Sequence, residues 1–309
     1  THGLSQLSRI SGALLMISAD RILPLWLKYR DALETPVRTF EFPKFGRRFE
    51  DRTYQMGVLN LSPDSTYRET VCHTFEAALY RGRRMTLEGA AMVDIGAEST
   101  GETADLVSIE RQIDRMRPVV KALADENILV SVETYHPEVG VALLEAGAGV
   151  INLTGRVDDS ALYEAIASHQ AGLILCYTPG ENARSADSLP PAEDIFDHQL
   201  TFFKERVDFA TNAGVERLWV DPGFGFALHL PDGPDRIRYQ TDSILQSFRL
   251  RELGWPVTVQ LTGAVYLFRD EVRVAQTSAA TIAVMSRANL VRSHEVPRVQ
   301  PVLNLQDFA

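Results

Sequence analysis

The sequence has few cysteines and no long apolar segment. Only two of its 309 residues are cysteine, Cys72 and Cys176, which is too few for a disulfide framework and gives no metal-binding spacing. We interpret both as small, semi-apolar side chains in a reducing compartment. No apolar run reaches the length that crosses a bilayer, and the start of the chain carries no secretory signal pattern. The sequence therefore predicts a cytoplasmic protein with no membrane partner.

Positive charge is also in short supply. The chain has 31 Lys and Arg against 41 Asp and Glu, a formal net charge of −10. This acidic balance argues against a nucleic-acid partner, because the phosphate backbone needs a basic surface. It does not exclude a small anionic substrate, since one arginine inside a cleft can hold a phosphate whatever the net charge.

A Gly-x-Gly-x-x-Gly dinucleotide fingerprint is absent as well, which bears on the choice between two α/β folds. From residue 54 onward, short apolar runs alternate with amphipathic segments, a pattern typical of parallel strands joined by right-handed helical crossovers. Eight such runs favour a closed (β/α)₈ TIM barrel over the alternative, an open doubly wound sheet. The runs are Tyr54–Leu59, Met92–Ile95, Ile128–Val132, Val150–Leu153, Leu173–Cys176, Leu218–Val220, Val257–Leu261 and Asn289–Val291.

The first 53 residues precede this pattern. An apolar periodicity over residues 8–35 predicts a helix that is broken or kinked near Pro24 and ended by Thr35-Pro36. Residues 38–53 then read as a short hairpin. We expect an N-terminal helical extension and hairpin over residues 1–53 and one barrel domain over residues 54–309.

Polar residues follow most of the apolar runs. The C-terminal ends of all strands of a parallel barrel meet at one rim, so these side chains are expected to converge there. A single one of them would be explained as a loop cap, but polar residues at six of eight strand ends predict a functional site. The residues are Asn60, Glu98-Ser99-Thr100, Glu133, Asn152, Asp221, Arg292 and His294.

Six segments around these residues form longer motifs, in order along the chain: Met56–Ser65, Asp94–Thr100, Val132–Tyr135, Ile151-Asn152, Asp221–Phe226 and Val291–Val296. With them the sequence resembles the dihydropteroate synthase family. The similarity runs collinearly from about residue 54 to residue 298, with Glu133 where the family usually has Asp.

The resemblance implies a reaction and a set of roles. A hydroxymethyl-dihydropterin diphosphate loses diphosphate, and the amine of p-aminobenzoate takes its exocyclic carbon in folate biosynthesis. The pterin edge needs a carboxylate and an amide in a dry slot, and the leaving group needs donors or cations. The resemblance also implies Mg²⁺ with the diphosphate, contacted by Asn60, and a homodimer. The expected pterin-binding residues are Glu133, Asn152 and Asp221, the diphosphate-binding residues are Asn60, Thr100, Arg292 and His294, and the catalytic residues are Arg292 and His294.

Three positions depart from the family pattern. Ala264 stands where the family has Lys, Gly101 where it has Arg, and Thr66 where it has Phe. Two loop arginines, Arg68 and Arg184, are possible substitutes for the missing cations, although each alone is interpreted as a solvated loop residue. Three functions therefore stay open: the synthase with p-aminobenzoate or another acceptor, a pterin-binding paralogue without the transfer, and a pterin-dependent methyltransferase domain. The last usually works with a corrinoid domain, for which this chain has no room.

Overall fold

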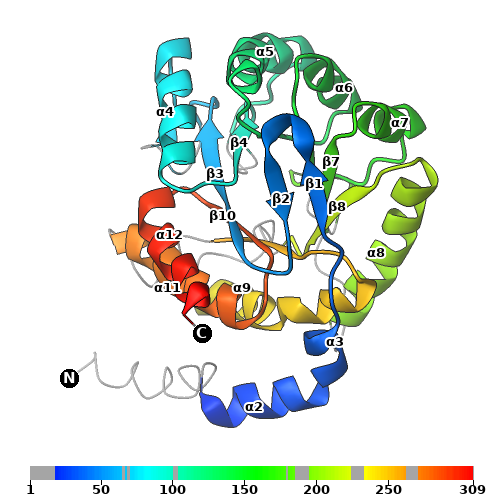
Figure 1. Ribbon diagram of the computed structural model, residues 1–309, viewed down its shortest axis with the longest axis vertical. Helices are drawn as coiled ribbons and strands as arrows, with labels where there is room; N and C mark the ends of the chain where they lie inside the picture. The colour runs from blue at the N-terminus through cyan, green and yellow to red at the C-terminus, as the bar shows by residue number, and fades with distance from the viewer. Residues whose placement is uncertain are drawn as a thin grey trace.

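The computed structural model describes residues 18–64, 67, 70–99, 104–178, 180–184, 195–223, 233–261 and 271–308. Eight parallel strands form one sheet in the order β8-β7-β6-β5-β4-β3-β10-β9. A parallel bridge between Val220 and Val257 joins β8 to the segment before β9, so the sheet is nearly closed into a barrel (Figure 1). The predicted TIM barrel is confirmed. The strands are β3 (Tyr54–Asn60), β4 (Met92–Gly96), β5 (Val130–Thr134), β6 (Val150–Leu153), β7 (Gly172–Cys176), β8 (Arg217–Asp221), β9 (Thr258–Gln260) and β10 (Leu290–Ser293).

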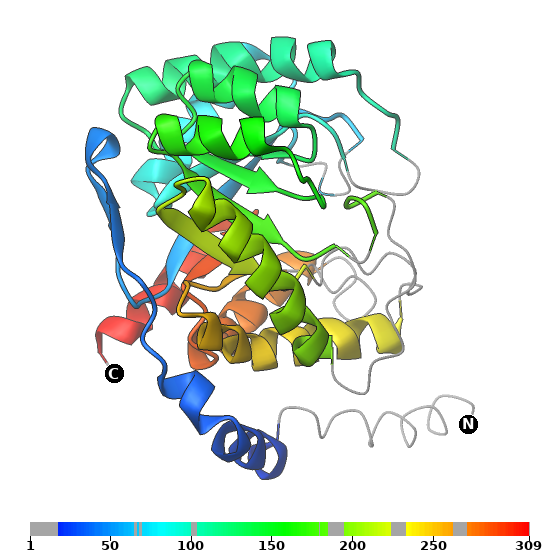
Figure 2. The same cartoon turned by 90° about the vertical axis from the view of Figure 1, so that its right-hand side faces the viewer.

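Helices surround the sheet, as Figures 1 and 2 show. Two of them begin after a residue whose side chain accepts a hydrogen bond from a backbone amide of the first turn. Thr74 accepts from the amide of Ala77, and Ser108 accepts from the amide of Arg111. The helices after β3 are α4 (Phe75–Leu87), α5 (Ile109–Asp125), α6 (Pro137–Glu145), α7 (Ser160–Ser168), α8 (Ile195–Asn212), α9 (Pro234–Gln246), α11 (Val272–Met285) and α12 (Val296–Asn304). No helix within the described ranges is both long and apolar enough to cross a membrane.

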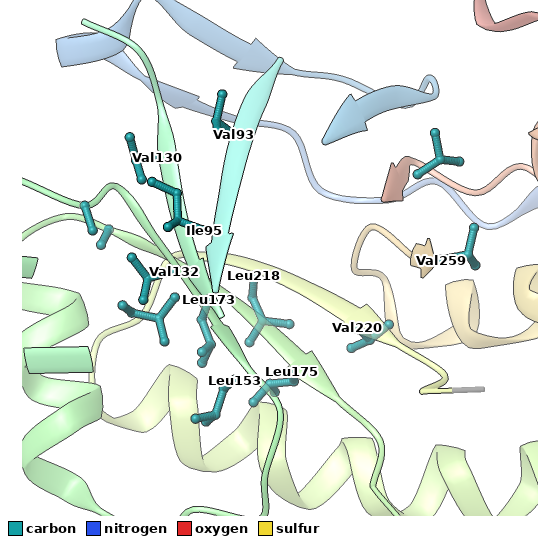
Figure 3. Close-up of a cluster of buried hydrophobic side chains, with 14 of the residues drawn as sticks. Val93, Ile95, Val130, Val132, Leu153, Leu173, Leu175, Leu218, Val220 and Val259 are labelled. Atoms are coloured by element: carbon teal, nitrogen blue, oxygen red, sulfur yellow. The ribbon is translucent and has the colours of Figure 1, made fainter. Parts of the chain in front are cut away.

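The main core lies between the sheet and this ring of helices. Branched side chains that alternate along the strands are fully buried there, among them Val93 and Ile95 on β4 and Val130 and Val132 on β5 (Figure 3). Because both faces of such a sheet are covered, its strands read as nearly continuous apolar runs. A polar residue inside such a strand therefore stands out, and it has to find a partner inside the barrel.

The described part of the N-terminal extension, from residue 18, comprises two short helices and a hairpin. Helix α2 (Ala19–Lys28) continues through Pro24, and α3 (Arg30–Glu34) stops just before Thr35. Strands β1 (Phe40–Phe42) and β2 (Arg47–Phe49) pair antiparallel across Gly46, whose φ of 58° suits a residue without a side chain. The expected hairpin is therefore present, whereas the helix is interrupted at Tyr29 and not near Pro24.

The hairpin covers the N-terminal end of the barrel. The rings of Phe40, Phe42 and Phe49 surround Trp219 of β8, with centroids 4.6 Å, 6.2 Å and 5.1 Å from the indole. Arg217, at the start of β8, donates to the carbonyl of Glu41. Because aromatic side chains fill this end, a ligand site is expected at the opposite end, where the strands finish. Figure 2 shows the hairpin lying across the end at which the strands begin.

Candidate active site at the C-terminal end of the barrel

Asp94 is the centre of a buried polar cluster inside the barrel. Its Oδ1 accepts from Ser131 Oγ at 2.6 Å, and its Oδ2 accepts from Arg292 Nε at 2.7 Å and from Asn152 Nδ2 at 3.2 Å. Its side chain has no exposed surface. A carboxylate buried this deeply is tolerated only when its oxygens are paired, and strands β5, β6 and β10 supply the three partners of this β4 residue.

Arg292 joins Asp94 to a second carboxylate. Its Nη2 donates to Glu133 Oε2 at 2.5 Å, so Nε and Nη2 serve two different acids. Burial raises the pKa of Glu133, an effect that the charge of Arg292 opposes and that of Asp94 reinforces. The Arg292 side chain is 8% exposed, so it is buried together with the acids that it contacts.

Asp221 and Cys176, on adjacent strands, complete this buried group. We call its members together the inner pocket: Asp94, Glu133, Asn152, Cys176, Asp221 and Arg292. Asp221 Oδ1 accepts from the amide of Gly223 at 2.8 Å. A Cβ on Gly223 would lie 1.8 Å from the carbonyl oxygen of Tyr177, so only glycine fits there. Burial raises the pKa of Asp221 to about 7. The Cys176 thiol, whose pKa burial raises well above its usual value, donates to Asn152 Oδ1 at 3.3 Å.

These contacts fix the orientation of the Asn152 amide. Its nitrogen donates to Asp94 while its oxygen accepts from Cys176, so rotating the group by 180° would break both bonds. Asn152 is 3% exposed and Asp221 6% exposed. The pocket thus contains an oriented amide and a carboxyl group on either side of Cys176, and these groups are complementary to a flat ring edge that carries N–H donors and a carbonyl.

A second cluster, around His294, joins the ends of β3 and β10. Thr70 Oγ1 lies 3.0 Å from Asn60 Nδ2 and 3.1 Å from His294 Nδ1. The Tyr67 ring stacks on the His294 ring with centroids 4.5 Å apart, and its hydroxyl donates to Glu295 at 2.6 Å. Burial, with Arg292 and Arg81 nearby, lowers the pKa of His294 well below its usual value, which favours the neutral imidazole at neutral pH.

A third cluster ties the segment after β4 to the segment after β7. Arg184 donates from Nη1 to the carbonyl of Ser99 at 2.6 Å and from Nη2 to the carbonyl of Ala104 at 2.5 Å. Its Nη1 also lies 3.5 Å from Glu98, whose carboxylate accepts from Tyr135 at 2.8 Å. With a side chain only 15% exposed, Arg184 is not the solvated loop residue that we expected.

Comparison of the sequence with known proteins identifies the family to which the chain belongs. The model of the family described as "Pterin binding enzyme" matches residues 56–294. The chain belongs to the pterin-binding enzyme family. It is 30% identical over 268 residues to the dihydropteroate synthase of Synechocystis sp., covering 83% of this chain and 90% of that protein.

Two further comparisons agree with this family. A probable bifunctional folylpolyglutamate synthase/dihydropteroate synthase of Halobacterium salinarum is 34% identical over 254 residues, but the chain spans only 30% of its length. The solved Xanthomonas albilineans dihydropteroate synthase with 4-aminobenzoic acid superposes with a TM-score of 0.70 at 30% identity. That alignment covers 85% of this chain and 95% of the solved one.

Most of the site residues predicted from the sequence lie together in this member of the pterin-binding enzyme family. Glu133, Asn152, Asp221 and Arg292 share the inner pocket. Asn60 and His294 meet through Thr70 beside it. Thr100 lies outside the described residues, as do Thr66, Arg68, Gly101 and Ala264. Among the described residues, no group of three or more His, Cys, Asp or Glu side chains could hold a metal ion.

Two residues of the pocket were not among the predicted site residues. For Asp94 the sequence held a signal, because an acid in the middle of the apolar run Met92–Ile95 needs a buried partner. For Cys176 it held none, because a cysteine at a strand end has the composition of ordinary core. Arg184 was named as a possible cation, but a loop arginine shows its partners only when the loop is folded.

Proposed function

We propose that this protein is a dihydropteroate synthase-type transferase of folate biosynthesis. The amine nitrogen of p-aminobenzoate would bond to the exocyclic carbon of a hydroxymethyl-dihydropterin diphosphate. The carbon–oxygen bond to the diphosphate would break, the diphosphate would leave with the electron pair, and the amine would lose a proton. The observation that carries the proposal is the presence of two buried groups, an oriented Asn152 amide on β6 and the Asp221 carboxyl on β8, on either side of Cys176 on β7.

The pterin ring would lie against Asp221 and Asn152, with Glu133 at its edge. Ionised Asp221 would accept N–H bonds from the ring, and a binding site that leaves such buried donors unpaired loses about 1–3 kcal/mol. Cys176 and Asp94 would act as positioning residues, because they hold the amide of Asn152 in one orientation. The pocket's low exposure would keep water away from these bonds.

The diphosphate would lie toward Asn60, Thr100, Arg292 and His294, and Arg292 and His294 would be the catalytic residues of this side. His294 in its neutral form would contribute one ring N–H as a donor and no positive charge. Arg292 would supply the charge that stabilises the leaving group as negative charge develops.

Magnesium would bind at this site only together with the diphosphate of the substrate. Asn60 offers an amide oxygen, and the described residues contain no cluster of His, Cys, Asp or Glu that could hold a metal. Mg²⁺ commonly takes most of its ligands from phosphate oxygens and water, with few from protein. Bound in this way, it would shield the diphosphate charge while Asn60 contacts it.

A pterin-binding paralogue without the transfer reaction is the second candidate, and one observation favours it. The guanidinium of Arg292 is engaged by two carboxylates, Asp94 and Glu133, before any substrate arrives. The three pocket acids Asp94, Glu133 and Asp221 make the surroundings of Arg292 unfavourable for an anion. A pocket of this kind would still hold a pterin ring.

Two measurements decide between these functions. Product formation from the pterin diphosphate and p-aminobenzoate with Mg²⁺ is expected for the synthase, and omission of p-aminobenzoate should abolish it. A calorimetric titration with pterin alone should give binding under either candidate. Binding without product would support the paralogue, and product with another amine but not with p-aminobenzoate would support a different acceptor. The absence of pterin binding would contradict both functions.

We also propose that the protein is a cytoplasmic homodimer that acts on this small molecule and not on nucleic acid or membranes. The dimer and the compartment rest on the resemblance and on the composition. Light scattering at micromolar concentration should return twice the chain mass of 34.4 kDa. A monomer mass would contradict the dimer.

A further inference from the structure

The side edge of the Arg292 guanidinium, formed by Nε and Nη2, is already hydrogen-bonded to side chains of the protein. This edge of a guanidinium can grip the two oxygens of one phosphate or carboxylate with parallel bonds. Here Nε donates to Asp94 at 2.7 Å and Nη2 to Glu133, so the edge is shared between two acids of the protein. A diphosphate that sought the same grip would have to displace one of them.

Glu133 is the partner that can be displaced, because the two acids are held differently. Asp94 is fully buried and also accepts from Ser131 and Asn152. Glu133 keeps 14% of its side chain exposed, and Arg292 is the partner that it has in the cluster. Loss of Glu133 would leave the contacts of Asp94 in place.

The length of Glu133 makes the contact possible. In the sheet order, β4 and β3 lie between β5, which carries Glu133, and β10, which carries Arg292. Gly96 at the end of β4 leaves the path open: a Cβ there would lie 3.3 Å from Glu133 Oε2, a tight contact. Aspartate, which is one methylene shorter, would hold its carboxylate further back on β5.

The negative charge of the pocket also disfavours the binding of a diphosphate. Asp94, Glu133 and Asp221 face one guanidinium, that of Arg292. Two backbone carbonyls and Glu98 already occupy the guanidinium of Arg184, and Arg81 donates to the carbonyl of His294 outside this group of acids. A diphosphate that approaches Asp94, Glu133 and Asp221 therefore meets an acid-rich environment in which Arg292 is already paired.

We infer that Glu133 is a specificity-determining residue which, by holding Arg292, sets how much a diphosphate adds to the binding of a pterin. The inference rests on the proposed function for the pterin itself. The wild type should bind a pterin and its diphosphate form with affinities that differ little. Releasing Arg292 should create a preference for the diphosphate form.

The test compares Glu133→Gln and Glu133→Asp with the wild type. Calorimetry would measure the Kd of a hydroxymethyl-pterin, of its diphosphate and of inorganic diphosphate, each with and without Mg²⁺. We expect Glu133→Gln to raise the preference for the diphosphate form about ten-fold or more, the scale of one charge-assisted contact. Glu133→Asp should give a smaller increase, and the affinity for the ring without diphosphate should change less.

Glu126→Gln is the matched control. Glu126 accepts two bonds from Arg83 on the protein surface, so this change also removes a glutamate charge paired with an arginine, but outside the pocket network. Its diphosphate preference should equal that of the wild type. If Glu133→Gln fails to fold, as judged by circular dichroism, Glu133→Asp decides the result.

An unchanged diphosphate preference in the folded Glu133 variants would overturn the inference. Failure of the wild type to bind either pterin would instead overturn the proposed function. Inorganic diphosphate then remains the probe for Glu133. Tighter diphosphate binding by the variants than by the wild type would uphold the Arg292 argument, and equal binding would refute it.

Discussion

Single residues set the chemistry of this pocket, and the protonation of Asp221 should affect stability in a way that can be measured against pH. Burial raises its pKa from 3.8 to about 7. The folded protein therefore holds a proton that the unfolded chain has lost between these two values. The stability contributed at this residue is greatest at low pH, falls as pH rises from about 4 to 7, and stays low above that window.

Asp221→Asn should remove this pH dependence. Relative to that variant, the wild type should lose at most about 1.4 kcal/mol of unfolding free energy per pH unit between pH 5 and 7. Pterin affinity of the wild type should rise over the same window, because the ionised carboxylate accepts N–H bonds. Denaturant unfolding and calorimetry across pH 4–8 measure both. Asp125→Asn, an exposed partner of Lys121, is the control. Parallel stability profiles for wild type and Asp221→Asn would contradict the assignment.

At the scale of elements, Arg184 links two segments that are distant in sequence. Its guanidinium holds the carbonyls of Ser99 and Ala104, on either side of residues 100–103, from the segment after β7. Hydrogen bonds from a charged donor contribute about 1.5–3 kcal/mol each when they are well made. The arginine therefore acts as a structural tie between the end of β4 and the end of β7.

Arg184→Ala should loosen this tie while leaving the barrel folded. We expect amide hydrogen exchange at Ser99 and Ala104 to become faster, with a loss of about 1–3 kcal/mol in unfolding free energy. Arg217→Ala is a matched control, since Arg217 also donates to two carbonyls, those of Glu41 and Gln170, but at the N-terminal end of the barrel. Equal exchange at Ser99 and Ala104 in both variants would rule out the tie.

The whole molecule separates stability from function along the barrel axis. The hairpin and its aromatic cluster close the N-terminal end, while the polar clusters lie where the strands finish. Buried aromatic contacts at one end can therefore change without touching the other. This arrangement is typical of TIM barrels, in which sites are built from the segments that follow the strands.

Phe42→Ala tests this separation. The ring is 3% exposed and stacks on Trp219 at 6.2 Å, so its loss should lower the unfolding free energy by about 3–5 kcal/mol. Pterin affinity of the folded protein should change less than about two-fold, because no pocket contact is lost. Arg48→Ala, an exposed change on the same hairpin, should do neither. A large loss of pterin affinity in folded Phe42→Ala would show that the two ends are coupled.

Much of the fold and part of the site could be predicted from the sequence alone. Apolar runs such as Leu173–Cys176 coincide with strands because a strand covered on both faces is apolar along most of its length. The polar residues Asn152, Asp221 and Arg292 could be assigned to one site because parallel strands end on one rim. The resemblance supplied the pterin and the reaction, neither of which follows from periodicity.

Only the tertiary structure decided which of these polar residues are partners. Nothing in the spacing of Asp94, Glu133 and Arg292 along the chain shows that one guanidinium serves two acids from strands that are not its neighbours. Nor does it show that Cys176 orients Asn152, or that Arg184 reaches Ser99 across 85 residues. The pattern of apolar residues along a strand indicates which residues are buried, and burial is a property of each residue. Pairing depends on side-chain length and direction once the barrel has closed, and these are properties of the folded whole.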